Sequence, residues 1–141
     1  MTTSDRPILL IEDNEQNRYL LTFLLEQHGY RVVSAADGAR GIAAARDLTP
    51  ALILLDIQLP TMDGYAVARA LREHEALRET PIVAVTSYAM PGDREKALAA
   101  GCTGYIEKPI DPQTFVAEME RALPPLGSAL VGARTSVGDE P

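Results

Sequence analysis

The chain has 141 residues, enough for one domain with a buried core, and its 46% hydrophobic and 23% charged content is ordinary for a globular protein. A net charge of −7 argues against non-specific nucleic-acid binding, because no basic surplus exists to neutralise phosphates. The single cysteine, Cys102, excludes an intrachain disulfide and a cysteine zinc site. No apolar run approaches the roughly 18 residues of a membrane span, and the polar start of the chain does not resemble a signal peptide. We therefore expect a cytoplasmic protein.

Short apolar runs alternate with helical patterns through the first half of the chain. We predict strands over 8–11, 31–35 and 52–56, and expect the third, which is the most apolar, to be central. A helix capped by Asn14 follows the first strand and stops at Gly29. A second helix begins near Ala39 and ends before Pro50.

The second half continues the alternation. Pro60, Asp63 and Gly64 predict a loop, followed by a helix over 65–74 and a strand over 82–86. A helix with Pro91 in its first turn continues over 93–100, and a short strand covers 105–107. Asp111 is expected to cap the last helix, with Pro112 in its first turn. The pattern predicts an α/β fold, a doubly wound parallel sheet of five strands and five helices in one domain over 5–124, with a disordered tail over 125–141.

Polar residues follow the predicted strands where each strand ends: Glu12, Asp13, Asp56, Thr86 and Lys108. Because ligand sites of open parallel sheets lie beyond the carboxyl ends of the strands, we expect these side chains to converge. Clustered carboxylates repel one another, and Mg²⁺ with its preference for oxygen ligands would relieve that repulsion. Alone, each residue has an ordinary explanation as a helix cap or a solvated charge. Together they predict a site for phosphoryl transfer, with Asp56 as the nucleophile.

These motifs, taken together, resemble the receiver (CheY-like) domain of two-component response regulators. The matching segments are Ile11-Glu12-Asp13-Asn14, Leu55 to Pro60 with Met62-Asp63-Gly64, Pro81 to Thr86, and Lys108-Pro109. The resemblance implies a flavodoxin-like fold with strand order 2-1-3-4-5. It also implies a cis Lys108–Pro109 peptide bond. Glu12-Asp13 stands where the family more often has two aspartates.

The resemblance assigns a role to each site residue. Asp56 matches the phosphoacceptor, Thr86 and Lys108 the phosphoryl-sensing hydroxyl and the family's lysine, and Tyr105 the aromatic switch residue. The implied metal is Mg²⁺, which Mn²⁺ could replace, with ligands from Asp13, Asp56, the backbone carbonyl of Gln58 and, through a water, Glu12. Gln58 and Tyr88 match positions that flank the phosphoryl group and modulate its chemistry. We expect Tyr88 to shield the acyl phosphate from water.

The implied function is a phosphorelay switch rather than an enzyme acting on other molecules. Its phosphodonor would be a histidine kinase or a histidine phosphotransfer protein, and its output a protein partner, with a phosphorylation-dependent dimer as one option and no role for nucleic acid or membrane. The chain resembles both single-domain DivK-like regulators and the receiver of a hybrid histidine kinase. We expect the donor to dock on the first helix and on the loop after the last strand, at Asn14, Asn17, Arg18, Leu21, Pro109 and Ile110.

Three other readings of the sequence are open. A haloacid-dehalogenase-like phosphohydrolase also uses a strand-end aspartate and Mg²⁺, but usually has a second aspartate where this chain has Gln58. A nucleotide-binding module would need a glycine-rich loop after the first strand, where the chain instead has the acidic Glu12-Asp13-Asn14. A receiver-like adaptor that is never phosphorylated would have the same fold but not the phosphoryl-transfer chemistry.

Overall fold

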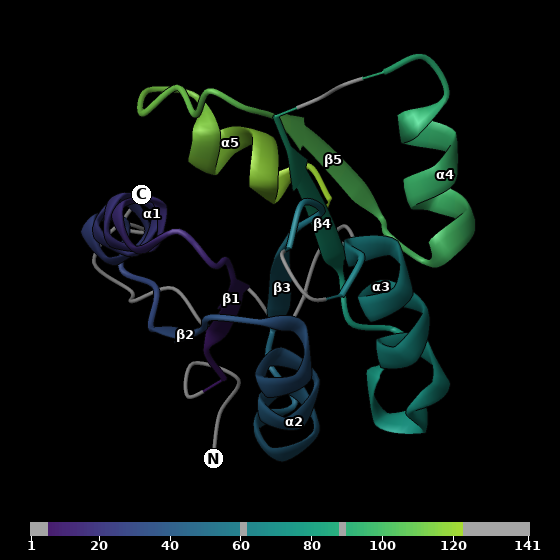
Figure 1. Ribbon diagram of the computed structural model, residues 1–141. Coiled ribbons are helices and arrows are strands. Elements are labelled where there is room, and N and C mark those ends of the chain that lie inside the picture. The colour runs from purple at the N-terminus through teal and green to yellow at the C-terminus, as the bar shows by residue number, and fades with distance from the viewer. Residues whose placement is uncertain (1–5, 60–61, 88–89, 123–141) are drawn as a thin grey trace.

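The computed structural model describes residues 6–59, 62–87 and 90–122 of the chain. The elements alternate between strand and helix, with one 3₁₀ helix (η2) before the fourth strand (Figure 1). In chain order they are β1 (Ile8–Ile11), α1 (Glu15–Gln27), β2 (Val32–Ala35), α2 (Gly38–Leu48), β3 (Leu52–Asp56), α3 (Gly64–Glu73), η2 (Glu75–Leu77), β4 (Ile82–Thr86), α4 (Asp93–Ala100), β5 (Gly104–Glu107) and α5 (Phe115–Glu120).

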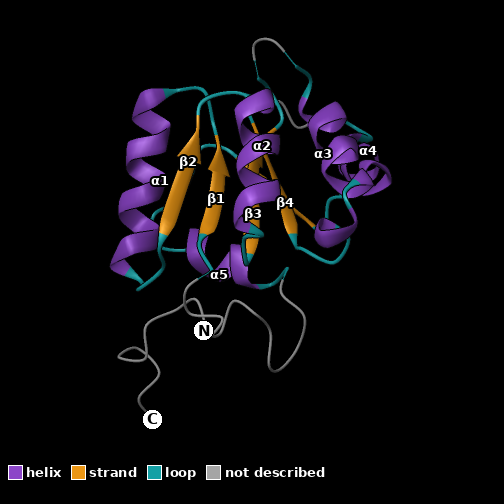
Figure 2. Cartoon of the chain, turned by 90° about the horizontal axis from the view of Figure 1, so that it is seen from below, coloured by secondary structure: helices purple, strands orange, loops and turns teal. Residues whose placement is uncertain are grey.

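The strands form one parallel sheet in the order β2-β1-β3-β4-β5, which confirms the predicted doubly wound fold and its strand order. β3 is the middle strand and every one of its residues is buried, as its apolar run predicts. Helices cover both faces of the sheet: α1 and α5 lie on one, and α2, α3 and α4 on the other (Figures 1 and 2). Such cover on both faces explains why the three inner strands, β1, β3 and β4, are almost entirely apolar and buried at every residue, whereas the edge strands β2 and β5 each have an exposed residue.

The sheet divides the core into two apolar clusters. Successive residues of a strand point to opposite faces, so Leu10 and Leu54 pack with α1 and α5, whereas Ile11 and Leu55 pack with α2 and α3. On α1, Leu21 and Leu25 supply the buried stripe of the first cluster. This alternation also determines on which face of the sheet the side chain at the end of each strand lies.

Most predicted boundaries agree with the structure to within a residue or two, including the caps of α1. The Asn14 side chain accepts a hydrogen bond from the Asn17 N–H, and Gly29 follows the helix in a left-handed conformation with φ of 89°. The Lys108–Pro109 peptide bond is cis, as the resemblance implies. No helix in the described part of the chain is both long and apolar enough to cross a membrane.

Two predicted helix starts are wrong. α4 begins at Asp93 after Gly92, so Pro91 lies in the preceding turn rather than in the helix. α5 begins at Phe115, because the Asp111 carboxylate accepts from the Gln113 N–H and closes a turn before the helix. In both places a proline starts a turn that the helix only later continues. The tail predicted to be disordered lies outside the described residues.

Candidate phosphoryl-transfer site

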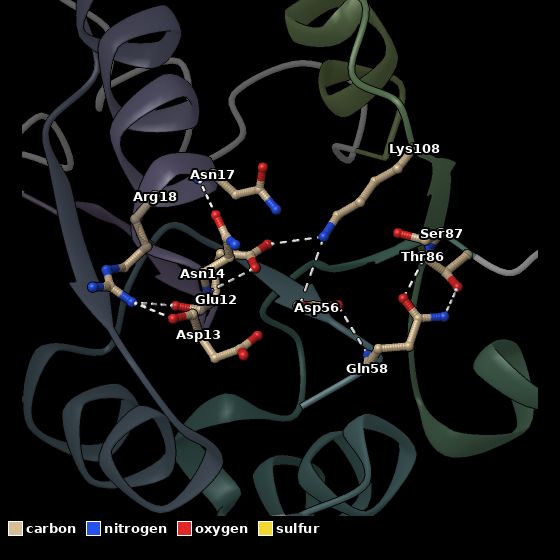
Figure 3. Close-up of polar contacts among 10 residues, drawn as sticks. All are labelled: Glu12, Asp13, Asn14, Asn17, Arg18, Asp56, Gln58, Thr86, Ser87 and Lys108. Atoms are coloured by element: carbon tan, nitrogen blue, oxygen red, sulfur yellow. Dashed lines mark hydrogen bonds and ion pairs between the residues drawn. The ribbon is translucent and has the colours of Figure 1, made fainter. Parts of the chain in front are cut away.

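Three carboxylates converge at the carboxyl edge of the sheet, as the sequence predicts. Glu12 and Asp13 follow β1, and Asp56 is the last residue of β3, the strand that is hydrogen-bonded to β1. One oxygen from each lies within 4.8 Å of the others. Figure 3 shows the three side chains around the end of β3, with Lys108 reaching them from the end of β5. Elements far apart in the sequence thus bring one cluster together.

Asp56 is buried at the bottom of this edge, with 3% of its surface exposed. Its Oδ1 accepts a hydrogen bond of 2.9 Å from the Gln58 N–H, and its Oδ2 lies 3.7 Å from the Lys108 Nζ. The pKa of Asp56 is raised from 3.8 to about 7, chiefly by burial and also by the Glu12 charge, although the Gln58 N–H and Lys108 act in the opposite direction. Without a metal, ionisation of Asp56 therefore costs the folded protein free energy.

Glu12 is also buried, with 1% of its surface exposed. Its Oε1 accepts from the Lys108 Nζ at 3.2 Å, and its Oε2 accepts from the Asn14 N–H at 3.2 Å. The Arg18 guanidinium donates to the backbone carbonyls of Glu12 and Asp13 at 2.9 and 3.0 Å. The first turn of α1 thereby fixes the backbone of the acidic pair.

This donor set suits a hard divalent cation. Three carboxylates gather around one point, and the ammonium of Lys108 balances only part of their charge. Mg²⁺ takes oxygen ligands and retains several waters, so one or two direct carboxylates suffice. Asp13 is exposed at the rim and Asp56 is buried beneath it, so a cation between them could keep waters on the open side. The backbone carbonyl of Gln58 stays a predicted ligand.

A second polar group joins β3 to β4 beside the acidic cluster. The Gln58 Nε2–H donates to the Thr86 Oγ1 at 2.7 Å, and the Ser87 N–H donates to the Gln58 Oε1 at 2.9 Å. Thr86 is buried at the end of β4, where the sequence places it. Residue type does not predict the contact of Ser87, because it is made by a backbone N–H that every residue except proline has.

Tyr105 lies on β5 and packs against the cluster beneath α2, α3 and α4. β4 residues 82 and 84 point to the same face, so by alternation Thr86 shares that face with Tyr105. The Arg94 guanidinium of α4 lies over the Tyr105 ring, 5.1 Å from its centroid. The Thr86 hydroxyl, the Tyr105 ring and α4 therefore lie on the same face of the sheet.

The expected docking residues fall into different environments. Asn14 and Pro109 are exposed, whereas Asn17, Arg18 and Ile110 are half-buried. Leu21 is 1% exposed within the core beneath α1, so its assignment as a docking contact is wrong. Helical spacing alone could not tell its buried face from the exposed one. Tyr88, the expected shield of the acyl phosphate, lies outside the described residues.

Comparison with known proteins agrees with this geometry. A family model described as "Response regulator receiver domain" matches residues 8–120. Two curated relatives are the polar-differentiation response regulators DivK of Brucella ovis and Brucella anthropi, each 40% identical over 111 residues, which are 79% of this chain and 90% of the relative.

Solved structures show the same fold. The chemotaxis protein CheY4 of Vibrio cholerae superposes with a TM-score of 0.80 at 30% identity, over 84% of this chain and 98% of that one. The receiver domain of the sensor histidine kinase PA1611 of Pseudomonas aeruginosa, solved with a magnesium ion coordinated in its active-site cleft, gives a TM-score of 0.75 at 38% identity over 82% and 95% of the two chains. The protein belongs to the response regulator receiver domain family of two-component signalling.

Proposed function

We propose that Asp56 accepts a phosphoryl group from a phosphohistidine, with Mg²⁺ at the acidic cluster, and that the modified protein signals through a change of conformation. The observation that carries this proposal is the environment of Asp56: a buried carboxylate with two further carboxylates and an ammonium around it. Proteins of this family are generally signalling switches, and receiver domains bind Mg²⁺ at an acidic pocket.

The transfer forms one bond and breaks one. An Asp56 carboxylate oxygen attacks phosphorus, and the bond from phosphorus to the donor's imidazole nitrogen breaks, with its electron pair remaining on nitrogen. A proton on the second imidazole nitrogen allows the donor to leave as neutral histidine. Bound Mg²⁺ would offset the negative charge of the carboxylates and of the phosphoryl oxygens. Hydrolysis of the acyl phosphate by water would later restore the Asp56 carboxylate.

The surrounding side chains have separate roles in this proposal. Lys108 Nζ already lies 3.2 Å from Glu12 and 3.7 Å from Asp56, so it can move to a phosphoryl oxygen without crossing a large gap. Glu12 would hold a metal-bound water, and Asp13 and Asp56 would contact the ion directly. Arg18, through the two carbonyls it binds, would keep the acidic pair in place.

The proposed switch uses the face that Thr86 shares with Tyr105. A phosphoryl group on Asp56 would draw the Thr86 hydroxyl towards it, and Tyr105 would then move into the space that Thr86 leaves. Because Arg94 of α4 lies over the Tyr105 ring, this movement would alter the surface formed by α4, β5 and α5. A downstream protein would bind that surface in one of its two conformations.

The proposed donor is a histidine kinase or a histidine phosphotransfer protein. The exposed start of α1 and Lys108, the residue before Pro109, lie beside the acidic cluster (Figure 3), so a phosphohistidine presented there could reach Asp56. Asn14, Asn17, Arg18, Pro109 and Ile110 remain the proposed docking residues.

Intact-mass measurement after incubation with acetyl phosphate and Mg²⁺ tests the proposal. We expect one phosphoryl adduct, absent in Asp56→Asn and in the wild type with excess chelator. Asp47→Asn, an exposed carboxylate on α2, is the matched control and should keep the adduct. Failure of the wild type to take an adduct from acetyl phosphate or from a phosphorylated histidine kinase would contradict the proposal. Steady release of phosphate from small phosphate esters would favour a phosphohydrolase instead.

A further inference from the structure

The side-chain amide of Gln58 uses both of its ends at the carboxyl end of β4. Its Nε2–H donates to the Thr86 Oγ1 at 2.7 Å, and its Oε1 accepts from the Ser87 N–H at 2.9 Å (Figure 3). The backbone of the same residue donates to the Asp56 Oδ1 at 2.9 Å. One residue therefore links the proposed phosphoacceptor to the two neighbouring polar groups of the next strand.

The groups that Gln58 holds are of the kind that a phosphoryl group requires. Phosphoryl oxygens accept strong hydrogen bonds from hydroxyl and backbone N–H donors. The Ser87 N–H donates to the amide oxygen of Gln58, and the Thr86 hydroxyl is pinned by its amide nitrogen. The Gln58 side chain thus occupies the Ser87 N–H, for which a phosphoryl oxygen would compete, and its hydrogen bond to the Thr86 oxygen holds that side chain at its resting position.

We propose that the Gln58 side chain is a latch for the resting state: it holds Thr86 and Ser87 until a phosphoryl group on Asp56 displaces it. The inference rests on the proposed function, since it concerns the same switch. It makes Gln58 a positioning residue that acts through Thr86. The latch lowers the apparent affinity of the site for a phosphoryl group, because its hydrogen bonds must break first.

Gln58→Met tests the latch, because methionine keeps the length of the side chain and removes both hydrogen bonds, while the backbone N–H to Asp56 remains. The probe is beryllofluoride with Mg²⁺, a non-covalent mimic of the phosphoryl group, titrated while amide signals are followed by NMR. Losing one hydrogen bond of about 1 kcal/mol net corresponds to about fivefold, so the loss of one to both bonds should lower the midpoint by about fivefold to about thirtyfold. Gln27→Met, an exposed glutamine at the end of α1, is the matched control and should leave the midpoint unchanged.

A second measurement needs no phosphoryl mimic. In the metal-free resting protein, we expect the χ1 populations of Thr86, read from three-bond couplings to its methyl carbon, to shift in Gln58→Met, because the variant loses the hydrogen bond from the Gln58 amide. The Ser87 amide should also exchange its hydrogen faster in the variant.

The outcomes separate the latch from the proposed function. If the wild type binds no beryllofluoride, the proposed function is contradicted. The Thr86 χ1 measurement, which needs no phosphoryl mimic, then still tests whether Gln58 holds Thr86. A wild type that binds beryllofluoride, with Gln58→Met binding equally or more weakly, overturns the latch and gives Gln58 a purely structural role. An unchanged Thr86 rotamer in Gln58→Met overturns it as well.

Discussion

Replacing Asp56 with asparagine should stabilise the metal-free protein, and more so at high pH. Burial raises the pKa of Asp56 from 3.8 to about 7, so between these values the folded protein binds more protons than the unfolded chain. Its stability therefore falls as the pH rises through that window. One pKa unit corresponds to about 1.4 kcal/mol, so an ionised Asp56 costs the fold on the order of 4 kcal/mol above pH 7. Asparagine keeps the shape and removes the charge.

Urea denaturation followed by circular dichroism, with chelator present, measures this effect. The stability gained by Asp56→Asn should be larger by about 3 kcal/mol at about pH 8.5 than at about pH 5, because most of the ionisation cost develops between them. Asp47→Asn, on the exposed surface of α2, should change stability by less than about 0.5 kcal/mol at both values.

Added Mg²⁺ should stabilise the wild type more than Asp56→Asn, because it binds the folded carboxylate cluster. The reasoning fails if Asp56→Asn is no more stable than the wild type at the higher pH, or if its gain is the same at both pH values. Either result would mean that burial of the Asp56 carboxylate does not disfavour its charge.

Two further variants and one chemical reaction test the packing of the fold. Gly64→Ala should destabilise the fold by about 2 kcal/mol or more in urea denaturation, because a Cβ there would lie 2.5 Å from the backbone Cα of Ile57; an unchanged midpoint would mean that the loop yields. Tyr30→Phe should cost about 1.5 kcal/mol in the same assay by removing the hydrogen bond to the Glu120 carboxylate, and no loss would contradict that bond. The Cys102 thiol, whose pKa burial raises to about 11, should react with a thiol reagent only as fast as the protein unfolds, and rapid reaction of the native protein would show local opening.

The sheet can be predicted well from the sequence, because each strand is marked by a pattern within a few consecutive residues. Runs such as Ile8–Ile11 and Leu52–Asp56 are short, unbroken and apolar, which is what a strand covered on both faces requires. The carboxyl-edge rule then predicts that Glu12, Asp13 and Asp56 converge, and the structure confirms it. The starts of α4 and α5 are missed because a proline suits a turn as well as a first helical turn.

The remaining details depend on tertiary packing. Whether Leu21 faces the core or a partner depends on which side of α1 meets the sheet, and that side is set by the whole fold. The two hydrogen bonds of the Gln58 side chain depend on its rotamer and on the end of a strand 28 residues away. Neither the residue type nor its spacing carries that information.

The division of the core by the sheet has a consequence for how such a protein can change over generations. The cluster beneath α1 and α5 and the cluster beneath α2, α3 and α4 share no side chains, because strand residues alternate between the faces. Substitutions in well-separated positions add in their effects on stability. Substitutions in the layer that contains Tyr105 and α4 can therefore accumulate with little effect on the packing of the layer beneath α1 and α5.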